Sequence, residues 1–176
     1  MKRKHCFWYF LLLGAAFGFI SKQEPACERP ILISGKLEIT YSEEGRVKFR
    51  LFTEEALHYE NGDRAYPAGV RVEFYKPEEE EGVVAVGRAD RVYFFADKNV
   101  YEFRGNVSVK SMREQKQLKT EELHWHPETE TLHTTTFIRM EAGDELLTGE
   151  GLTAGQDLSH YSIPKPQGVC RVESIK

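Results

Sequence analysis

Apolar and polar residues alternate along the chain from residue 31 onward. The first such segment is Leu37-Glu-Ile-Thr-Tyr41. The same period of two recurs in the segments 47–51, 70–74, 84–86, 92–94, 101–103, 107–109, 123–125, 132–134, 138–140 and 161–163. This period places apolar side chains on one face of a strand, and turn sequences such as Asn61-Gly62-Asp63 separate the segments. The pattern predicts an all-β body made of about ten or more short antiparallel strands.

The predicted strands form a loose internal repeat. An apolar residue preceded by small or acidic residues opens each unit, at Leu57, Val92, Leu123 and Leu152, and these positions lie 35, 31 and 29 residues apart. Hairpins stacked at a nearly fixed period build a sheet whose apolar face continues along the stacking axis. Closing, stacking or folding the sheet hides that face. The face then either packs a dry core or lines a groove for an apolar ligand.

The charges divide the chain into two parts. The formal net charge of −4 argues against a protein that binds nucleic acid by neutralising its phosphates. Residues 1–22 contain four basic residues and no acidic one. The rest of the chain therefore has 20 basic and 28 acidic residues, a net charge of −8. A basic head and an acidic body predict two different environments.

The basic head precedes an uncharged apolar run, residues 6–20. A helix of this length reaches about 22 Å, which is short against a hydrocarbon core of about 30 Å, but flanking lysines shorten the gap by snorkelling. We expect residues 1–22 to be a retained signal anchor that sends residues 23–176 across a membrane. The alternatives are a cleaved signal peptide or a lipid anchor at Cys27. Cys27 and Cys170 either form a disulfide or remain free thiols.

Two groups of residues resemble metal sites in composition. His124 and His126 share one strand face, and His133 follows across a predicted hairpin, but no carboxylate is fixed beside them by spacing. The run Glu78–Glu81 lacks the alternating spacing of a Ca²⁺ loop and is typical of a solvated hairpin tip. We therefore expect no metal ion and no other cofactor.

Asp157, Ser159 and His160 supply the residue types of a hydrolase triad. No strand-turn-helix nucleophile elbow frames them, so their types alone do not indicate nucleophilic catalysis. We expect the protein to have no catalytic residue and not to be an enzyme.

Motifs in the second half of the chain resemble those of a known family. They are Gly105-Asn106-Val107-Ser-Val109, then Leu118-Lys-Thr120-Glu-Glu-Leu123-His-Trp125, and then Gly149-Glu-Gly151-Leu152 followed by Gln156-Asp157-Leu158. In this order they resemble the LptC family of lipopolysaccharide-export proteins in its Bacteroidetes-type form, and in part the related LptA/OstA-like domains. The resemblance covers about residues 35–163, and the apolar segment ahead of the body also fits the LptC layout.

The resemblance implies a twisted, open antiparallel β-jellyroll, also called a β-taco, preceded by one transmembrane helix. It implies an anchor over residues 1–22, a linker over 23–34, a periplasmic β-jellyroll over 35–170 and a tail over 171–176. Glycines inside strands permit bulges and close backbone approach, so Gly105, Gly149 and Gly151 are the candidates for bending the sheet.

The resemblance also implies a function in lipopolysaccharide transport. The protein would accept lipopolysaccharide from the inner-membrane ABC transporter LptB–LptF–LptG through its first strands, Leu37 to Leu51. It would pass the lipid to periplasmic LptA through its last strands, Leu147 to Ile163. The alternative is a soluble LptA-like periplasmic bridge, or another exported β-rich binding protein or lipoprotein.

Acyl chains would lie in an apolar groove between the two halves of the folded sheet. Burying hydrocarbon yields about 0.8 kcal/mol per CH₂ group, so a carrier of several chains needs a long apolar surface. The predicted lining residues share an inward position on period-two strands: Ile39, Phe49, Leu51, Val72, Phe74, Val86, Phe94, Phe103, Val107, Val109, Leu123, Trp125, Ile138 and Met140.

Overall fold

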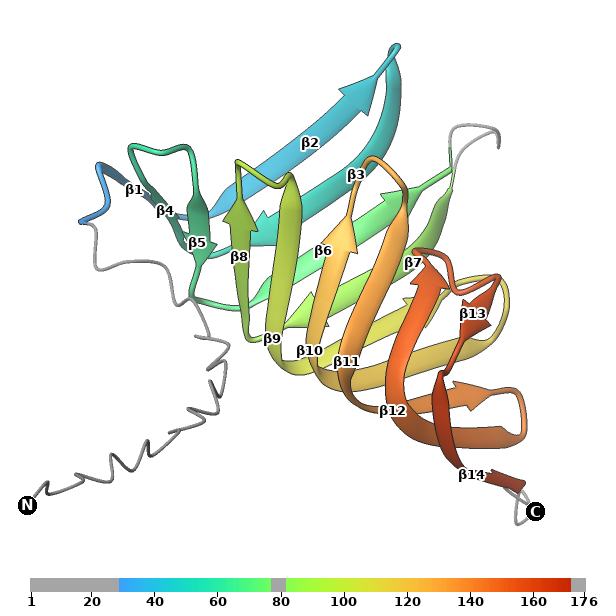
Figure 1. Cartoon of the computed structure of the whole chain (residues 1–176). Helices are drawn as coiled ribbons and strands as arrows, with labels where there is room; N and C mark the ends of the chain where they lie inside the picture. Colours follow the sequence, from blue (N-terminus) through green and yellow to red (C-terminus); the bar gives the residue numbers. More distant parts are fainter. Residues whose placement is uncertain (1–28, 77–81, 172–176) are drawn as a thin grey trace, which may run out of the picture.

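The computed structural model describes residues 29–76 and 82–171. These residues form one antiparallel sheet of 14 strands, which confirms the predicted all-β class (Figure 1). The strands are β1 (Leu32–Ser34), β2 (Leu37–Glu43), β3 (Arg46–Thr53), β4 (Ala56–His58), β5 (Arg64–Tyr66), β6 (Val70–Tyr75), β7 (Val83–Ala89), β8 (Arg91–Phe95), β9 (Val100–Ser111), β10 (Lys116–His126), β11 (Thr131–Ala142), β12 (Glu145–Gly155), β13 (Tyr161–Ser162) and β14 (Lys165–Arg171).

Several expectations concern residues outside the described ranges. They are the anchor over 1–22, Cys27 and the run Glu78–Glu81. Within residues 29–76 and 82–171, the structure contains no helix long and apolar enough to cross a membrane. Strand β1 lies inside the segment 23–34 that the sequence analysis treats as a linker.

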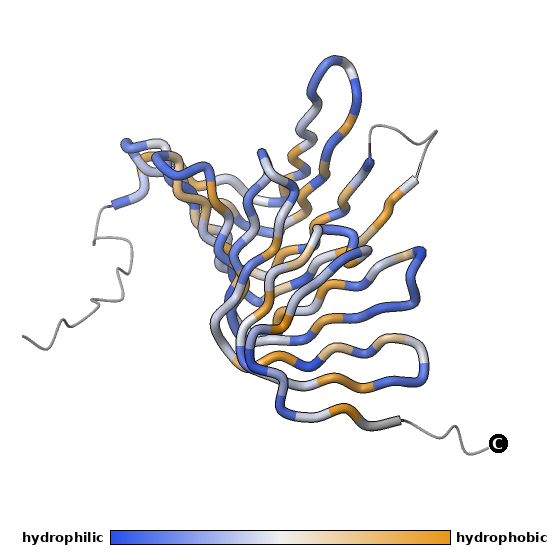
Figure 2. The backbone as a smooth tube through the Cα atoms, turned by 45° about the vertical axis from the view of Figure 1, so that its right-hand side comes forward, coloured by the Kyte–Doolittle hydropathy of each residue, from blue (hydrophilic) through white to orange (hydrophobic). Residues whose placement is uncertain are grey.

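The sheet is folded into two walls that share four strands. One branch runs β2-β3-β6-β7 and the other runs β1-β4-β5-β8, and both join β9. Strand β7 pairs with Ser108–Ser111 of β9, whereas β8 pairs with Val100–Arg104. We call the half that contains β6 and β14 the β6 wall, and the half that contains β8 and β13 the β8 wall. The long strands β9 to β12 cross from one wall to the other (Figures 1 and 2).

These crossing strands correct one prediction from the sequence. Segments 101–103 and 107–109 were expected to be separate short strands, but both belong to the 12-residue β9. Strand β11, of 12 residues, likewise contains two predicted segments, 132–134 and 138–140. A polar interruption in the alternation therefore marks a bend within a strand here, not the end of the strand.

The bends lie side by side and form a crease between the walls. Pairing shifts between Thr120 and Glu122 in β10 and between Thr134 and Phe137 in β11. In β9 the bend is at Gly105, whose φ of 76° lies in the left-handed region that favours glycine. Gly151 of β12, with a φ of 81°, provides the bend in that strand. The prediction that Gly105 and Gly151 bend the sheet is confirmed.

Hydrogen bonds of the side chains and of the backbone join the chain segments along this crease. The Asn106 amide donates to the Asp90 carboxylate at 2.7 Å, and the Asp90 N–H donates to the Gly105 carbonyl at 3.0 Å. The Thr120 hydroxyl donates to the Phe137 carbonyl at 2.8 Å. Buried backbone groups that lose their ladder partners at a bulge need such substitutes.

The apolar faces of both walls point inward and merge into one core. Figure 2 shows the resulting alternation of apolar and polar positions along the strands. Eleven of the predicted lining residues belong to the buried core, and Ile39 and Phe94 are partly buried against it: the eleven are Phe49, Leu51, Val72, Phe74, Phe103, Val107, Val109, Leu123, Trp125, Ile138 and Met140.

Val86 is the exception among the predicted residues. It pairs with Glu73 and Lys110 on the outer face of the β6 wall. The inward position is taken by Gly87, where an added Cβ would lie 3.4 Å from the Phe74 ring. Large aromatic side chains fill the space here, so small residues face them and the valine points outward. The predicted inward orientation of Val86 is wrong.

Candidate functional site

A cavity of about 350 Å³ opens between the two walls on the side opposite the crease. Tyr41 and Phe49 of the β6 wall line one side, and Phe94 and Tyr101 of the β8 wall line the other. Trp125 forms part of the lining from β10. The volume falls at the lower end of the range of about 300–1,000 Å³ that is usual for ligand pockets.

The aromatic rings at this cavity pack against one another across the two walls. The Trp125 ring lies 4.8 Å from the Phe49 ring, 4.9 Å from the Phe74 ring and 5.0 Å from the Tyr101 ring, measured between centroids. Trp125 comes from the β8 wall and both phenylalanines from the β6 wall. Each such aromatic pair adds about 0.5–1.5 kcal/mol beyond the area that it buries. Below the cavity, the interior is thus filled by the protein's own side chains.

Charged side chains surround the mouth of the cavity. The Lys48 ammonium of the β6 wall lies 3.1 Å from the Glu130 carboxylate in the turn between β10 and β11, and this ion pair spans the two walls. On the β8 wall, the Arg64 guanidinium lies over the Phe94 ring, 5.4 Å from its centroid. An apolar floor beneath a charged rim suits an amphipathic ligand, whose polar part stays in water.

Two buried tyrosines near the cavity remain neutral over the physiological range. Burial raises the pKa of the Tyr101 phenol, and it raises that of Tyr66 although Arg64 opposes the shift. A raised pKa makes each phenol a weaker acid, so neither phenol is suited to donate a proton at this site.

Of the predicted lining residues, only Phe49, Phe94 and Trp125 line the cavity. Tyr41 and Tyr101 also line the cavity, although they are not among the predicted lining residues. Tyr101 is two residues before Phe103, and Tyr41 is two residues after Ile39, so the period of two already placed both on the inward face.

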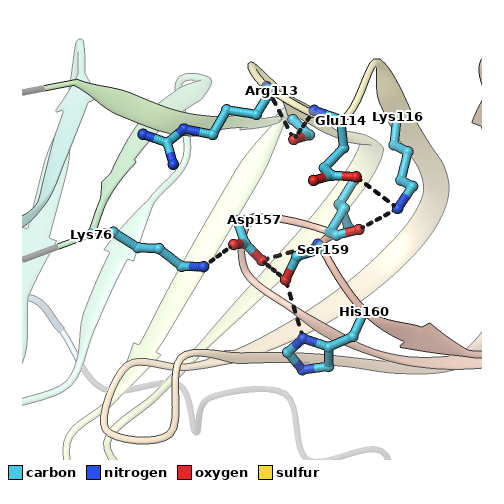
Figure 3. A network of polar contacts seen from close by, with 9 residues as sticks. Lys76, Arg113, Glu114, Lys116, Asp157, Ser159 and His160 are labelled. Carbon is cyan, nitrogen blue, oxygen red and sulfur yellow. Dashed lines mark hydrogen bonds and ion pairs between the residues drawn. The ribbon is translucent and has the colours of Figure 1, made fainter. Parts of the chain in front are cut away.

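Residues 156–160, which join β12 to β13, close another part of the open side between the two walls. The Gln156 side chain is buried and accepts a hydrogen bond from the Trp125 indole N–H at 3.2 Å. The Leu158 side chain is fully buried in the common core. Asp157 forms an ion pair with Lys76 at the end of β6, and Figure 3 shows this contact together with its neighbours.

The Asp157 carboxylate is ionised at all ordinary pH values. Burial alone would raise its pKa, but Lys76 and both the N–H and the hydroxyl of Ser159 stabilise the charge and lower the pKa to about 2. The Ser159 contacts measure 3.0 Å from the backbone nitrogen and 2.7 Å from the hydroxyl.

Known proteins give one decisive comparison. A sequence profile described as lipopolysaccharide-assembly, LptC-related, matches residues 6–163. The chain belongs to the LptC family. Membership makes it a component of lipopolysaccharide transport and agrees with the open, folded antiparallel sheet. No curated protein matches the chain significantly.

The polar cluster of this LptC-related protein is not arranged as a catalytic triad. The Ser159 hydroxyl lies between the Asp157 carboxylate at 2.7 Å and the His160 Nδ1 at 3.2 Å (Figure 3). In a triad the histidine lies between the serine and the carboxylate. Here the hydroxyl donates directly to Asp157, and the contact stabilises the turn.

The histidines lie on the outer face of the β8 wall. His124 and His133 are directly paired across β10 and β11. The His133 ring contacts the Thr153 hydroxyl at 3.3 Å, while His124 lies with Glu102 and Glu122 in a group whose ligand atoms are within 4.8 Å of one another. Arg104 forms an ion pair with Glu102. The Arg104 guanidinium thus balances the charge of the Glu102 carboxylate within this group.

A larger hollow of about 770 Å³ lies on the outside of the β6 wall and the crease. Its lining includes Arg71, Arg88 and Asp90. The two arginines are direct cross-strand neighbours on the outer face. The hollow lies open on the outer face, whereas the smaller cavity lies between the walls above a floor of aromatic rings, so the smaller cavity is the better candidate site for an acyl chain.

Proposed function

We propose that this LptC-family protein accepts lipopolysaccharide from the LptB–LptF–LptG transporter and passes it to LptA, with acyl chains held between its two walls. The single observation that carries the proposal is the aromatic cavity on the open side of the folded sheet. Hydrocarbon leaves water there at a gain of about 0.8 kcal/mol per CH₂ group. The charged rim at Lys48 and Arg64 leaves the saccharide part in solvent.

Exposed strands at both ends of the sheet support a relay. At the N-terminal end, β1 and β2 each pair on one side only, with β4 and β3 respectively. Ile31, Leu32 and Ile33, in and beside β1, expose more than half of their surface. Unpaired strand edges offer N–H and C=O groups to a partner sheet. We infer that LptF and LptG bind at this end.

The C-terminal end offers a second edge to LptA. Strands β13 and β14 both pair with β12, so they form this edge, whereas β12 itself is covered on both sides. The predicted edge segment, Leu147 to Ile163, therefore includes most of β12, which is an interior strand. Only the last part of this segment, which contains β13, lies at the edge of the sheet. The exposed Val169 of β14 supplies an apolar contact there.

Localisation follows from the sequence and belongs to the same proposal. The apolar run 6–20 behind Lys2-Arg3-Lys4 anchors the protein in the inner membrane, with the β-domain in the periplasm. Retention of this segment in the mature protein supports this arrangement, and its cleavage supports a soluble LptA-like bridge.

Site-specific photo-crosslinking tests the proposal. A crosslinking amino acid at Phe94 or at Tyr41 should capture lipopolysaccharide, because both positions line the cavity and retain some exposure. The fully buried Trp125 and Phe103 are poorer choices, because a bulkier side chain there would disturb the core. Matched exposed positions on the outer faces are Arg71 and Lys119. Lipid captured only at these outer positions would refute the assignment of the cavity.

A further inference from the structure

Residues 156–160, which we call the strap, close the C-terminal part of the open side, and Figure 3 shows their polar contacts with Lys76 and Lys116. The strap leaves β12 at Gly155 and turns inward, since the Leu158 N–H donates to the Gly155 carbonyl at 2.9 Å. This turn carries the Leu158 side chain, which is 0% exposed, into the same core as the predicted lining residues Ile138 and Met140.

The strap is attached to the two walls in different ways. On the β8 wall, the Gln156 N–H donates to the Glu130 carbonyl at 2.9 Å, and the Gln156 side chain binds Trp125. On the β6 wall, two lysine side chains contact the strap. Lys76 pairs with Asp157, and Lys116 donates to the Leu158 carbonyl at 3.3 Å.

This asymmetry makes the β8 wall the hinge and the β6 wall the releasable side. Detaching the strap from the β6 wall frees these two lysine side chains, whereas detaching it from the β8 wall breaks the backbone hydrogen bond from Gln156 to Glu130. The Lys76 side chain is about one-third exposed, so water readily replaces its contact. Leu158 is the apolar group that such a movement would withdraw.

The open side is thus divided into two parts. The cavity with Tyr41 and Phe94 is accessible at the N-terminal part, whereas the strap covers the part next to β13 and β14. A lipid that moves from the N-terminal edge to the C-terminal edge has to pass the strap. An acyl chain in the place of Leu158 exchanges one apolar group for another, so the core keeps its hydrophobic contacts.

We propose that the strap is a displaceable closure and that a second part of the acyl-chain site, now occupied by Leu158, lies beneath it. The inference rests on the proposed function, because it assigns the path that the same lipid takes toward the C-terminal edge. Its ligand is the distal part of a long acyl chain whose proximal part occupies the cavity.

Locking the strap tests this inference. The variant Lys76→Cys/Asp157→Cys, in a full chain whose three native cysteines are serines, is joined with dithiobismaleimidoethane, a thiol crosslinker that reductant cleaves. The protein is held in lipid nanodiscs with hexadecanoic acid that carries a diazirine at its methyl end. After photolysis, peptide mass spectrometry locates the labelled residues.

We expect the locked protein to be labelled at the cavity, around Tyr41 and Phe94, and the cleaved sample to gain label in β11 and β12 around Met140 and Leu152. The control pair Lys119→Cys/Glu141→Cys lies on the outer face, where the native side chains are 3.3 Å apart, and its crosslinking should leave the labelling pattern unchanged.

Three results are distinguishable from the expected one. Equal labelling of β11 and β12 in the locked and cleaved states would overturn the proposal that the strap is a displaceable closure. Labelling of the cavity with no label beneath the strap in either state would overturn it as well. Absence of label in both states would instead overturn the proposed acyl-chain site. If the first variant does not fold, Lys116→Cys/Ser159→Cys locks the same segment.

Discussion

At the scale of single residues, Trp125 connects most of the features described above. It comes from the β8 wall, contacts Phe49 and Phe74 of the β6 wall, lines the cavity and holds Gln156 of the strap. An indole is suited to this position because it offers a large apolar surface and a single N–H donor. A phenylalanine would keep most of the packing but leave the buried Gln156 oxygen without its donor, at a cost of about 1–3 kcal/mol.

Asp157 gives a prediction about stability and pH. Its pKa is lowered in the folded protein to about 2, from 3.8 when unperturbed, so the carboxylate stabilises the fold above pH 3.8 and this contribution is lost as the pH falls toward 2. At pH 7, Asp157→Asn should lower the free energy of unfolding by about 1–2 kcal/mol, since the exposed part of Lys76 weakens the pair.

Urea denaturation between pH 7 and pH 2 measures this difference. The gap between wild type and variant should close at the acid end. Asp144→Asn, in an exposed turn, is the control and should show no comparable gap. A constant difference across the whole range would show that the asparagine acts through shape and not through charge.

Residue positions were predictable where the alternation is regular. Thirteen of the fourteen proposed lining residues face the core or pack against it, because strand periodicity fixes the face. The predicted orientation of Val86 is wrong because the segment 83–86 is apolar throughout and so gives no alternation from which to read the inward face. Gly87 takes the inward position next to Phe74. The Leu158 position was not predictable, since a loop has no periodicity that would point a side chain inward.

At the scale of elements, the crossing strands β9 to β12 decide the shape. The bends of β9 and β12 were indicated by Gly105 and Gly151, but those of β10 and β11, which contain no glycine, were not. The continuity of each strand through its bend was not predictable either, because the interrupted alternation resembles a turn. The branching of the sheet at β9 was also not predictable from the sequence. Pairing of β7 with one half of β9 and β8 with the other depends on long-range contacts that no local pattern encodes.

Gly149 gives a prediction for one element, the C-terminal edge strand β14. A Cβ at this position would lie 2.6 Å from the Lys165 carbonyl oxygen and 2.7 Å from the Ile163 side chain. Gly149→Ala should therefore push β14 away from β12 and lower the free energy of unfolding by about 1–3 kcal/mol. Hydrogen exchange should accelerate in residues 165–171.

The matched control is Gly35→Ala, where an added Cβ meets no atom within 4 Å. This variant should be close to wild type in urea denaturation. If hydrogen exchange in β14 is unchanged in the Gly149→Ala variant, the edge strand moves aside without a loss of stability. The edge would then be a looser docking site than proposed.

At the scale of the whole molecule, the described contacts form one body. Every pairing of the sheet lies within residues 32–171, and a single core joins both walls. A chain that lacks residues 1–22 should therefore fold into the same β-domain. Far-UV circular dichroism should show β structure, and urea denaturation should show one cooperative transition. Aggregation or a non-cooperative transition would mean that the N-terminal segment contributes to the fold.

The branching of the sheet at β9 also sets an order of assembly. Until β9 is present, the strands β1, β4, β5 and β8 form one paired group and β2, β3, β6 and β7 form another, with no hydrogen-bonded strand between them. From β9 onward, each strand pairs with its neighbour in sequence as far as β12, and such local pairing is fast. A growing chain that ends before residue 100 thus holds two unjoined sheets. Their relative position becomes fixed in a single event, the docking of β9 against both.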